Sequence, residues 1–350
     1  LVLGILVVMK VRKWVPVLWF IGIGLAVYLF EAWRYDMLDG AFVTYFLSWP
    51  TLFLAFFMLT EPFTMPPTKK LQAGYGALVG FLSNTTIFAP FFGMTPELAL
   101  ILGNLAMGPY RVQQKLFLQL KEKRQIAQDT YEFIFKKPTG FSFVAGQYVE
   151  WMLPHQSPDD KGVRRYFTIA SSPTETDIRA AMKITEKGSS FKKALQSLDV
   201  ERPVIASQLA GDFVLPKSKT EKLGFIAGGI GITPFRSHIR YMMDSDQTHD
   251  TVLYYCNNTV AEIAYQNLFS EAESKIPFRV IHVIAKETVA PPYENGFVTV
   301  EVLKRHTPDY LERTWYLSGP PPMVAAYTRL LLGAGVKRKH IVRDFFPGAV

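Results

Sequence analysis

Residues 223–234 read Leu223-Gly224-Phe225-Ile226-Ala227-Gly228-Gly229-Ile230-Gly231-Ile232-Thr233-Pro234. The run is apolar over the length of a strand, ends in glycines and leads into an amphipathic segment that continues to Met243. A strand, a glycine turn and a helix form the mononucleotide-binding unit, because glycines let the backbone approach phosphate and the helix N-terminus attracts its charge. The residues that we predict to contact a nucleotide here are Gly228, Gly229, Gly231, Thr233 and Pro234.

Strand-like and helix-like segments alternate after this unit. The predicted strands are Val252–Cys256, Arg279–Ile284, Trp315–Ser318 and Ile341–Phe345, and the predicted helices are Ala261–Ser274, Val298–Arg305 and Met323–Leu332. Such alternation predicts a doubly wound, mainly parallel α/β sheet. We assign it to a nucleotide-binding domain over residues 217–350.

The preceding segment, residues 113–216, has short runs with period-two alternation, separated by glycine and proline. The predicted strands are Lys115–Leu120, Thr130–Lys136, Gln147–Leu153, Arg165–Ile169, Ala180–Glu186 and Pro203–Ser207. Six strands at this spacing predict a small antiparallel β-barrel.

One predicted barrel strand continues as Arg165-Tyr166-Phe167-Thr168-Ile169-Ala170-Ser171-Ser172-Pro173, which resembles the flavin motif of the ferredoxin–NADP reductase superfamily. Further matches follow in the order of that family: Gly146-Gln147-Tyr148, Lys187-Gly188-Ser189-Ser190, Gly211-Asp212-Phe213, the Gly-Gly-x-Gly-x-Thr-Pro turn and Leu317-Ser318-Gly319-Pro320-Pro321-Pro322-Met323. The resemblance covers about residues 115–350. It implies an FAD-binding barrel followed by an NAD(P)-binding domain.

The resemblance also implies roles for individual residues. Arg165 would neutralise the flavin pyrophosphate through charge-assisted hydrogen bonds, and Phe167 would cover one face of the flavin ring. Thr168 would reach flavin N5, and Ser318, where the family has cysteine, would lie beside the nicotinamide; these two are the predicted catalytic residues. The other predicted cofactor-binding residues are Tyr166, Ile169, Ser171, Lys183, Gly188, Ser189, Ser190, Gly319, Pro320, Met323 and Phe346.

The preference between NADH and NADPH is predicted from the loop Cys256-Asn257-Asn258-Thr259. NADPH-selective relatives place arginine there to hold the 2′-phosphate. Asn258 occupies that position, so NADH is favoured over NADPH.

Residues 1–112 are poor in charge and predict a membrane domain. The apolar segments are Trp14–Trp33, Ala41–Leu59, Ala73–Phe92 and Met94–Met107, which we interpret as about four transmembrane helices. Lysine and arginine gather before the first, between the second and third, and after the last. This pattern predicts a multi-pass protein in contact with lipid, with its C-terminal domains on the cytoplasmic side. The chain opens at Leu1 inside an apolar run, so we expect further residues upstream.

Residues 49–110 resemble two related membrane proteins, one from the Rnf electron-transport complex and one from the sodium-translocating NADH:quinone reductase. The matching features are Thr60-Glu61-Pro62, Pro67-Thr68, a glycine-rich segment, Pro96-Glu97 and Gly103-Asn104. In that family a threonine upstream of this segment carries FMN. Thr44 lacks the expected neighbours, so we assign no covalent flavin.

Several classes of function are disfavoured by the residue inventory. Cys256 is the only cysteine, so a Cys₄ iron–sulfur cluster cannot form within this chain. None of the 6 histidines lies in the apolar region, which argues against an intramembrane haem. The net charge is +8, but the densest basic run, Lys337–His340, fits a solvated turn rather than nucleic-acid binding. We also assign no metal ligands.

The sequence therefore predicts a membrane-integrated, FAD-dependent NAD(P)H oxidoreductase. Its electrons would pass to a quinone, a second flavin or a partner protein. Three alternatives remain: a flavin-containing component of an ion-translocating complex, a haem-containing ferric-chelate or superoxide-producing reductase, and a module that binds nucleotide without turnover.

Overall fold

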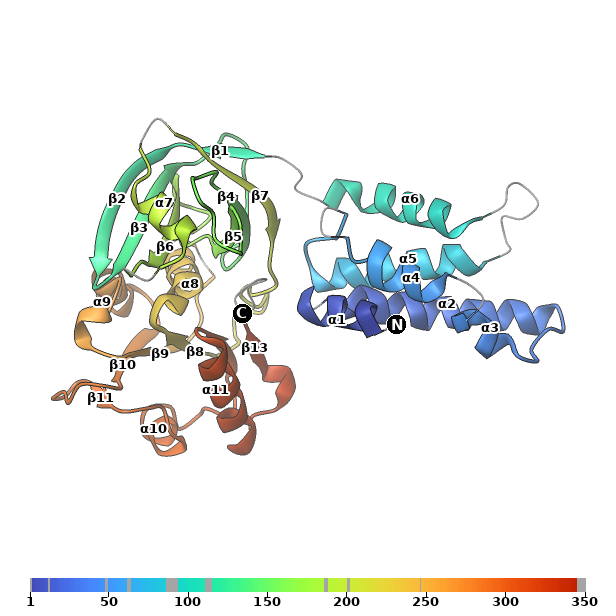
Figure 1. Ribbon diagram of the computed structural model, residues 1–350. Helices are drawn as coiled ribbons and strands as arrows, with labels where there is room; N and C mark the ends of the chain where they lie inside the picture. Colours follow the sequence, from blue (N-terminus) through green and yellow to red (C-terminus); the bar gives the residue numbers. More distant parts are fainter. Residues whose placement is uncertain are drawn as a thin grey trace. The chain divides into compact units, whose positions relative to one another are not determined.

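The computed structural model describes residues 2–11, 13–47, 50–61, 64–85, 94–110, 115–185, 188–199, 202–245 and 247–344. The chain separates into two compact units. The helical unit consists of residues 1–114 with 208–210, and the C-terminal unit consists of residues 115–207 and 211–350. Figure 1 shows the elements of each unit. The three-domain division with boundaries after residues 112 and 216 stays a prediction.

The helical unit is built from short helices around one long one. Its elements are α1 (Val2–Val11), α2 (Trp14–Arg34), α3 (Ala41–Leu47), α4 (Thr51–Phe53) with a π-helical turn (Leu54–Met58), α5 (Lys69–Asn84), α6 (Pro96–Met107) and a 3₁₀ turn (Gly108–Tyr110). Helices α2 and α5 pack closely: a Cβ at Gly80 would lie 2.5 Å from the Phe20 carbonyl oxygen. Small residues at such a crossing let two backbones approach.

The described residues of this unit support fewer membrane-spanning helices than the four predicted. Among the described residues, only Trp14–Arg34 is long and apolar enough by itself to cross a membrane. Ala41–Leu47 and Thr51–Met58 satisfy the criterion only as a pair, bent by 53°. Length and composition in one or two helices are weak evidence for a membrane.

The described parts of the third and fourth predicted spans lie in α5 and α6, each of which begins at a threonine cap, whereas residues 86–92 of the third predicted span lie outside the described residues. The Thr68 hydroxyl accepts a hydrogen bond from the Leu71 amide at the start of α5, and Thr95 does the same for Leu98 at the start of α6. At 1.5 Å per residue these helices are about 24 and 18 Å long, short of a bilayer core of roughly 30 Å.

The first part of the C-terminal unit contains two small sheets. Its elements are β1 (Leu116–Leu118), β2 (Leu120–Ala127), β3 (Thr130–Lys136), β4 (Tyr148–Met152), β5 (Arg164–Thr168), β6 (Asp177–Lys183), α7 (Ser190–Gln196) and β7 (Val204–Ala210). The strand orders are β1-β7-β4-β5 and β2-β3-β6, and the pairs β1–β7, β2–β3, β3–β6 and β4–β5 are antiparallel. The prediction of an antiparallel β domain is confirmed.

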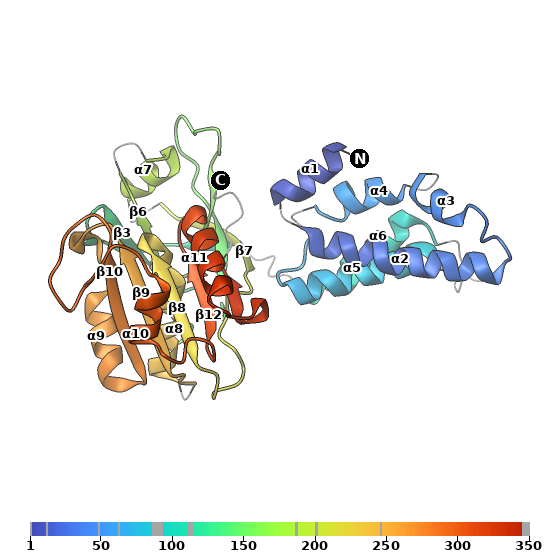
Figure 2. The same cartoon turned by 90° about the horizontal axis from the view of Figure 1, so that it is seen from below.

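The second part is a parallel sheet with helices on both faces. Its elements are β8 (Leu223–Gly228), a 3₁₀ turn (Gly229–Ile232), α8 (Thr233–Asp244), β9 (Thr251–Asn257), a 3₁₀ turn (Val260–Glu262), α9 (Gln266–Lys275), β10 (Phe278–Ile284), β11 (Glu294–Asn295), α10 (Val300–His306), β12 (Thr314–Ser318), α11 (Pro321–Gly333), a 3₁₀ turn (Arg338–His340) and β13 (Ile341–Arg343). The strand order is β11-β10-β9-β8-β12-β13, and neighbouring strands run parallel. Figure 2 shows β10, β9, β8 and β12 side by side. The doubly wound prediction is confirmed.

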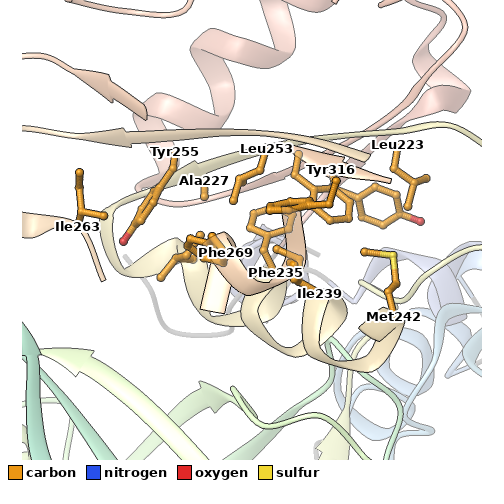
Figure 3. Close-up of a cluster of buried hydrophobic side chains, with 14 of the residues drawn as sticks. Leu223, Ala227, Phe235, Ile239, Met242, Leu253, Tyr255, Ile263, Phe269 and Tyr316 are labelled. Atoms are coloured by element: carbon orange, nitrogen blue, oxygen red, sulfur yellow. The ribbon is translucent and has the colours of Figure 1, made fainter. Parts of the chain in front are cut away.

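Two apolar layers hold the helices to this sheet. On one face, Phe235, Ile239 and Met242 of α8 and Phe269 of α9 meet side chains of β8, β9 and β12, including Tyr316 (Figure 3). On the other face, side chains of α10 and α11 cover the same strands. The buried apolar faces therefore fix the strands whose carboxyl ends carry the glycine turns.

Candidate functional site

The order of the parallel sheet locates its ligand-binding edge. The chain runs from β8 to β9 and β10 on one side and returns to β12 on the other, so β8 and β12 flank the topological switch point. Ligands of open α/β sheets bind at the carboxyl ends of the strands beside such a point. The loops that follow these two strands are the two predicted nucleotide motifs, Gly228–Pro234 and Ser318–Met323.

These two loops lie against each other with almost no space to spare. A Cβ at Gly231 would lie 2.5 Å from the Ser318 carbonyl oxygen and 2.6 Å from the Gly319 Cα. A Cβ at Gly228 would collide with the Met323 side chain and lie 3.1 Å from Pro320. The structure thus brings together the predicted residues of both loops. Thr233 and Pro234 continue the first loop as the buried first turn of α8.

Ser318 is fully buried, and its hydroxyl donates to a carboxylate oxygen of Asp344 at 2.9 Å. The Asp344 amide in turn donates to the Leu317 carbonyl at 2.8 Å. The hydroxyl that replaces the cysteine of the resembled motif therefore has a fixed orientation. The neighbouring prediction, Phe346, lies outside the described residues.

Strand β5, which carries the flavin-type motif, lies close to the hydrogen-bonded pair of Ser318 and Asp344. Thr168 is 4% exposed and faces Tyr148 across the β4–β5 pair. Burial raises the pKa of the Tyr148 phenol, and the nearby Tyr166 and Asp344 raise it further. The charge of Asp344 thus acts on Tyr148. Thr168 therefore faces a tyrosine whose pKa responds to the carboxylate that holds Ser318.

Arg165 and Ser190, the two predicted phosphate contacts, converge on one anion. The Arg165 Nη2 donates to the Asp159 carboxylate at 2.6 Å, and the Ser190 amide donates to the other oxygen of that carboxylate at 3.1 Å. Arg165 and the Ser190 amide thus donate to one carboxylate, and their predicted contact with a phosphate group stays a prediction. Gly188 and Ser189 lead into this point, and Ser189 is the N-cap of α7.

Side chains alternate between the two faces of β5, so Phe167 and Tyr166 of the flavin-type motif point in opposite directions. Phe167 packs against Phe191 of α7, with ring centroids 5.8 Å apart, on the side where the Arg165 guanidinium covers Phe191. Tyr166 instead packs edge-on against Tyr148 at 5.7 Å. Ring stacking by Phe167 stays a prediction, since the structure gives this side chain a packing partner of its own.

Ile169 and Ser171 are buried and engaged within the protein. Ile169 is fully buried, and the Ser171 hydroxyl accepts a hydrogen bond from the Arg179 amide at 3.1 Å. The Ser171 carbonyl accepts from the Ser237 hydroxyl of α8 at 2.6 Å. The structure gives both residues packing roles, and their contact with a cofactor stays a prediction.

Lys183 faces the nucleotide-binding part of the unit. Its ammonium donates to Glu262 at 2.7 Å, across a small cavity that Gly229 and Asn257 also line. The other Glu262 oxygen accepts from the Asn258 amide at 3.1 Å. Burial opposes ionisation of Glu262, but Lys183 holds the pKa of this carboxyl below its usual range. The structure therefore gives Lys183 a partner beside the glycine turn, and its predicted contact with a cofactor stays a prediction.

A buried ion-pair network joins the antiparallel sheets to α8 and α9; we name it the junction network. Arg236 donates to Glu175 and to the Ala170 carbonyl, and Tyr265 donates to the fully buried Glu132 at 2.9 Å. Burial opposes ionisation of Glu175, but Arg236 keeps the pKa of this carboxyl low. Sequence inspection did not identify this network, because its members lie on separate segments with no common motif.

The fold and these loops define a class of protein. The C-terminal unit is similar to the NAD(P)H-dependent flavin reductases, for which FAD and NAD(P)H are the typical cofactors. Within it, residues 225–329 match the family described as "Oxidoreductase NAD-binding domain". This confirms the reductase part of the resemblance drawn from the motifs. The matches give no support for a likeness of the helical unit to the Rnf membrane protein.

Individual relatives agree with this class. The chain is 26% identical over 225 residues to the glycine betaine monooxygenase reductase subunit of Chromohalobacter salexigens, covering 62% of this chain and 60% of that protein. The chain therefore spans less than two thirds of the length of this curated relative. The structure of a cytochrome P450 reductase from Amycolatopsis is similar, with a TM-score of 0.60 and 24% identity over 68% of this chain and 71% of that one.

A third similarity extends over nearly the whole chain. The flavohemoglobin of Malassezia yamatoensis, solved with bound FAD and haem, aligns with a TM-score of 0.60 and 17% identity. It covers 98% of this chain and 96% of that one. At this identity the likeness concerns the fold alone.

Proposed function

We propose that this chain is an FAD-dependent reductase that takes a hydride from NADH and passes electrons singly to a partner protein. The single observation that carries the proposal is the convergence of the Arg165 guanidinium and the Ser190 amide on one anion, in the same unit as the glycine turn. The names of the relatives support it, since the first is the reductase subunit of a monooxygenase. We therefore favour an oxygenase component as the class of electron acceptor.

FAD, when bound, would accept the hydride at its N5 atom and release two electrons one at a time. The residues of this chain supply binding and orientation. Arg165 and Ser190 would hold the pyrophosphate of FAD. A groove of about 450 Å³ begins at Ser190 and is lined also by Lys193, Asp199 and Arg202, so it offers room and hydrogen-bonding groups for the adenosine half.

On the nucleotide side, the backbone of the Gly228–Gly231 turn would approach the pyrophosphate of NADH. The Ser318 hydroxyl, held by Asp344, would orient the nicotinamide toward the flavin. Hydride transfer needs its two reacting carbon and nitrogen atoms roughly 3–3.5 Å apart, so positioning is the main catalytic contribution of these residues.

The preference for NADH rests on Glu262 together with Asn258. The Glu262 carboxylate is fixed by hydrogen bonds beside the loop after β9, where the 2′ position of the adenosine ribose is bound in nucleotide folds of this kind. A carboxylate accepts a bond from a 2′-hydroxyl and repels a 2′-phosphate. We expect kcat/KM for NADH to exceed that for NADPH by about tenfold or more, since one such contact is worth roughly 1.5–3 kcal/mol.

The experiment that tests the proposal is an anaerobic titration of the flavin-loaded full-length chain with NADH. The flavin absorbance near its long-wavelength maximum should bleach with one equivalent of NADH and return when an electron acceptor such as ferricyanide is added. A chain that takes up no flavin, or whose bound flavin is not reduced, would refute the proposed function.

We also propose that the helical unit attaches the chain to a membrane through Trp14–Arg34, with the C-terminal unit on the cytoplasmic side. The support is the apolar length of this helix and the glycine-lined packing of α2 against α5. The finer hypothesis, a domain like the membrane proteins of the Rnf complex and the sodium-translocating NADH:quinone reductase, rests on the residue motifs alone. Extraction of membranes at alkaline pH tests attachment: a protein released without detergent contradicts it.

A further inference from the structure

We propose that Asp159 is an internal occupant of the flavin phosphate site, which FAD must displace, so that this chain holds its flavin as an exchangeable cofactor. The inference rests on the proposed function, because it concerns the site that we assign to the FAD pyrophosphate. It adds that a side chain of the protein itself, Asp159, competes with the FAD pyrophosphate for this site.

The loop 159–162 satisfies Arg165 almost completely. The guanidinium Nη2 bonds Asp159 at 2.6 Å, and Nη1 donates to the carbonyl oxygens of Lys161 and Gly162 at 2.8 and 2.9 Å. The Arg165 side chain is only 14% exposed. A buried guanidinium without partners would be strongly unfavourable, so the loop stabilises Arg165 when no phosphate is present.

Asp159 and Ser190 are also bonded in both directions. The Ser190 amide donates to the Asp159 carboxylate at 3.1 Å, and the Asp159 amide donates to the Ser190 hydroxyl at 2.9 Å. The Lys161 amide adds a third bond to this carboxylate at 3.0 Å. The carboxylate therefore uses the same donors that a phosphate would need, and both cannot accept from them at once.

The charges at this point favour an anion that carries more than one negative charge. Burial lowers the pKa of Lys192, and the nearby positive charge of Arg165 lowers it further. Arg165 and Lys192, whose ammonium donates to the Lys183 carbonyl at 2.8 Å, both contribute positive charge to this region, and Asp159 supplies a single negative charge. A pyrophosphate diester carries two. It can displace Asp159, but its apparent affinity is reduced by the fraction of molecules in which the loop occupies the site.

The loop has backbone features at both ends that allow such a displacement. Ser157 and Gly162 adopt positive φ angles of 49° and 65°. Rotation at these two residues would move Asp159 away from Arg165 while β4 and β5 stay paired. The displaced loop would leave the Asp159 carboxylate in solvent, where its charge is well hydrated.

The first test compares FAD binding by flavin-free, full-length variants, measured by quenching of flavin fluorescence. Asp159→Asn removes the competing charge and keeps an acceptor at the same place, so we expect the FAD dissociation constant to fall about tenfold, as for a site that was available in only a tenth of the molecules. The matched control is Asp160→Asn at the adjacent exposed aspartate, which should leave binding unchanged. Equal or weaker binding by Asp159→Asn than by the control overturns the inference.

A second test uses the unaltered chain and does not depend on how the variant folds. The amides of Asp159 and Lys161 take part in hydrogen bonds that FAD would break. Hydrogen exchange at these two amides should therefore become faster on FAD binding, while exchange in β5 and α7 slows. Slower exchange at residues 159–161 in the FAD complex overturns the inference. If the unaltered chain binds no FAD at all, both the proposed function and this inference fail. If the unaltered chain and the Asp159→Asn variant bind FAD equally, only this inference fails.

Discussion

The flavin side and the nucleotide side of the candidate site use different groups to bind their ligands. On the flavin side, the phosphate donors are charged or polar side chains and one amide, and the protein satisfies them with its own carboxylate, Asp159. On the nucleotide side, the site is a pair of backbone turns pressed together at Gly231 and Gly319. The fit of these turns depends on the small size of glycine rather than on charge.

This difference predicts how each half responds to change. A site made of charges tolerates changes of shape but loses affinity when a charge is removed. A site made of glycine turns tolerates changes of charge nearby but not one added methyl group, because its neighbours are backbone atoms that cannot rotate away. The junction network, which joins the two halves, should respond to neither ligand directly.

The largest expected effect is on stability, and it comes from a substitution in the junction network that joins the flavin side to the nucleotide side. Arg236→Gln should lower the free energy of unfolding by about 3 kcal/mol, the lower end of the range for a broken buried ion pair, because it leaves the largely buried Glu175 with only the Arg179 side chain and the Ser172 amide as partners. Urea unfolding at neutral pH measures this value. Arg240→Gln is the control: its ion pair with Asp244 one turn further along α8 is partly exposed, so the loss should stay below about 0.5 kcal/mol. Equal losses in the two variants would contradict a role for the network in joining the halves.

The next largest effect is expected on FAD binding when a charge is removed from the flavin side. Arg165→Gln should weaken FAD binding by roughly 10–100-fold, the equivalent of about 1.5–3 kcal/mol for charge-assisted hydrogen bonds. NADH binding to the flavin-free chain should not change. The control is Arg164→Gln, whose side chain is 47% exposed and pairs with Glu150. Full flavin content in Arg165→Gln would show that this guanidinium does not hold the cofactor.

A change of shape on the nucleotide side should give a somewhat smaller effect with the opposite selectivity. Gly231→Ala places a methyl group against the Ser318 carbonyl, and we expect a loss of stability of about 1–3 kcal/mol and a higher KM for NADH, with flavin content unchanged. Gly333→Ala in α11 meets nothing within 4 Å and serves as the control. If Gly231→Ala lost flavin but kept its KM for NADH, the division into two halves would be wrong.

The smallest effect is expected at the hydroxyl of Ser318. Ser318→Ala removes one hydrogen bond to Asp344, worth about 0.5–1.5 kcal/mol, so the rate of flavin reduction should fall up to about tenfold. Thr328→Ala, which removes a hydroxyl bonded to the Val324 carbonyl within α11, is the control for general destabilisation. Anaerobic stopped-flow measurement of flavin bleaching distinguishes the two; identical rates would exclude Ser318 from orienting the nicotinamide.

Much of this architecture could be predicted from local sequence. The strand Thr130–Lys136 was predicted with its observed bounds, since alternation and flanking turn residues mark it. Edge strand β2 was not predicted, because most of its residues are exposed on both faces and pairing with β3, rather than burial, holds it. Helix α9 begins five residues later than predicted, after Tyr265 adopts a left-handed conformation.

The helical unit shows where hydropathy alone is insufficient. Apolar composition predicted four spans, but hydropathy does not show where each helix begins, and the described helices α5 and α6 start at the caps formed by Thr68 and Thr95. Hydropathy sums over residues, whereas helix length depends on where backbone amides find a side-chain acceptor.

The sequence by itself determined the class of the two C-terminal domains and the glycine turns, because periodicity and turn chemistry act between residues near one another in the chain. Only the tertiary structure decided that Asp159 pairs with Arg165, that Lys183 pairs with Glu262 and that Arg236 meets Glu175. Each of these contacts joins different structural elements. The physical reason is that an ion pair depends on distance in space, and no local pattern encodes which distant charge arrives.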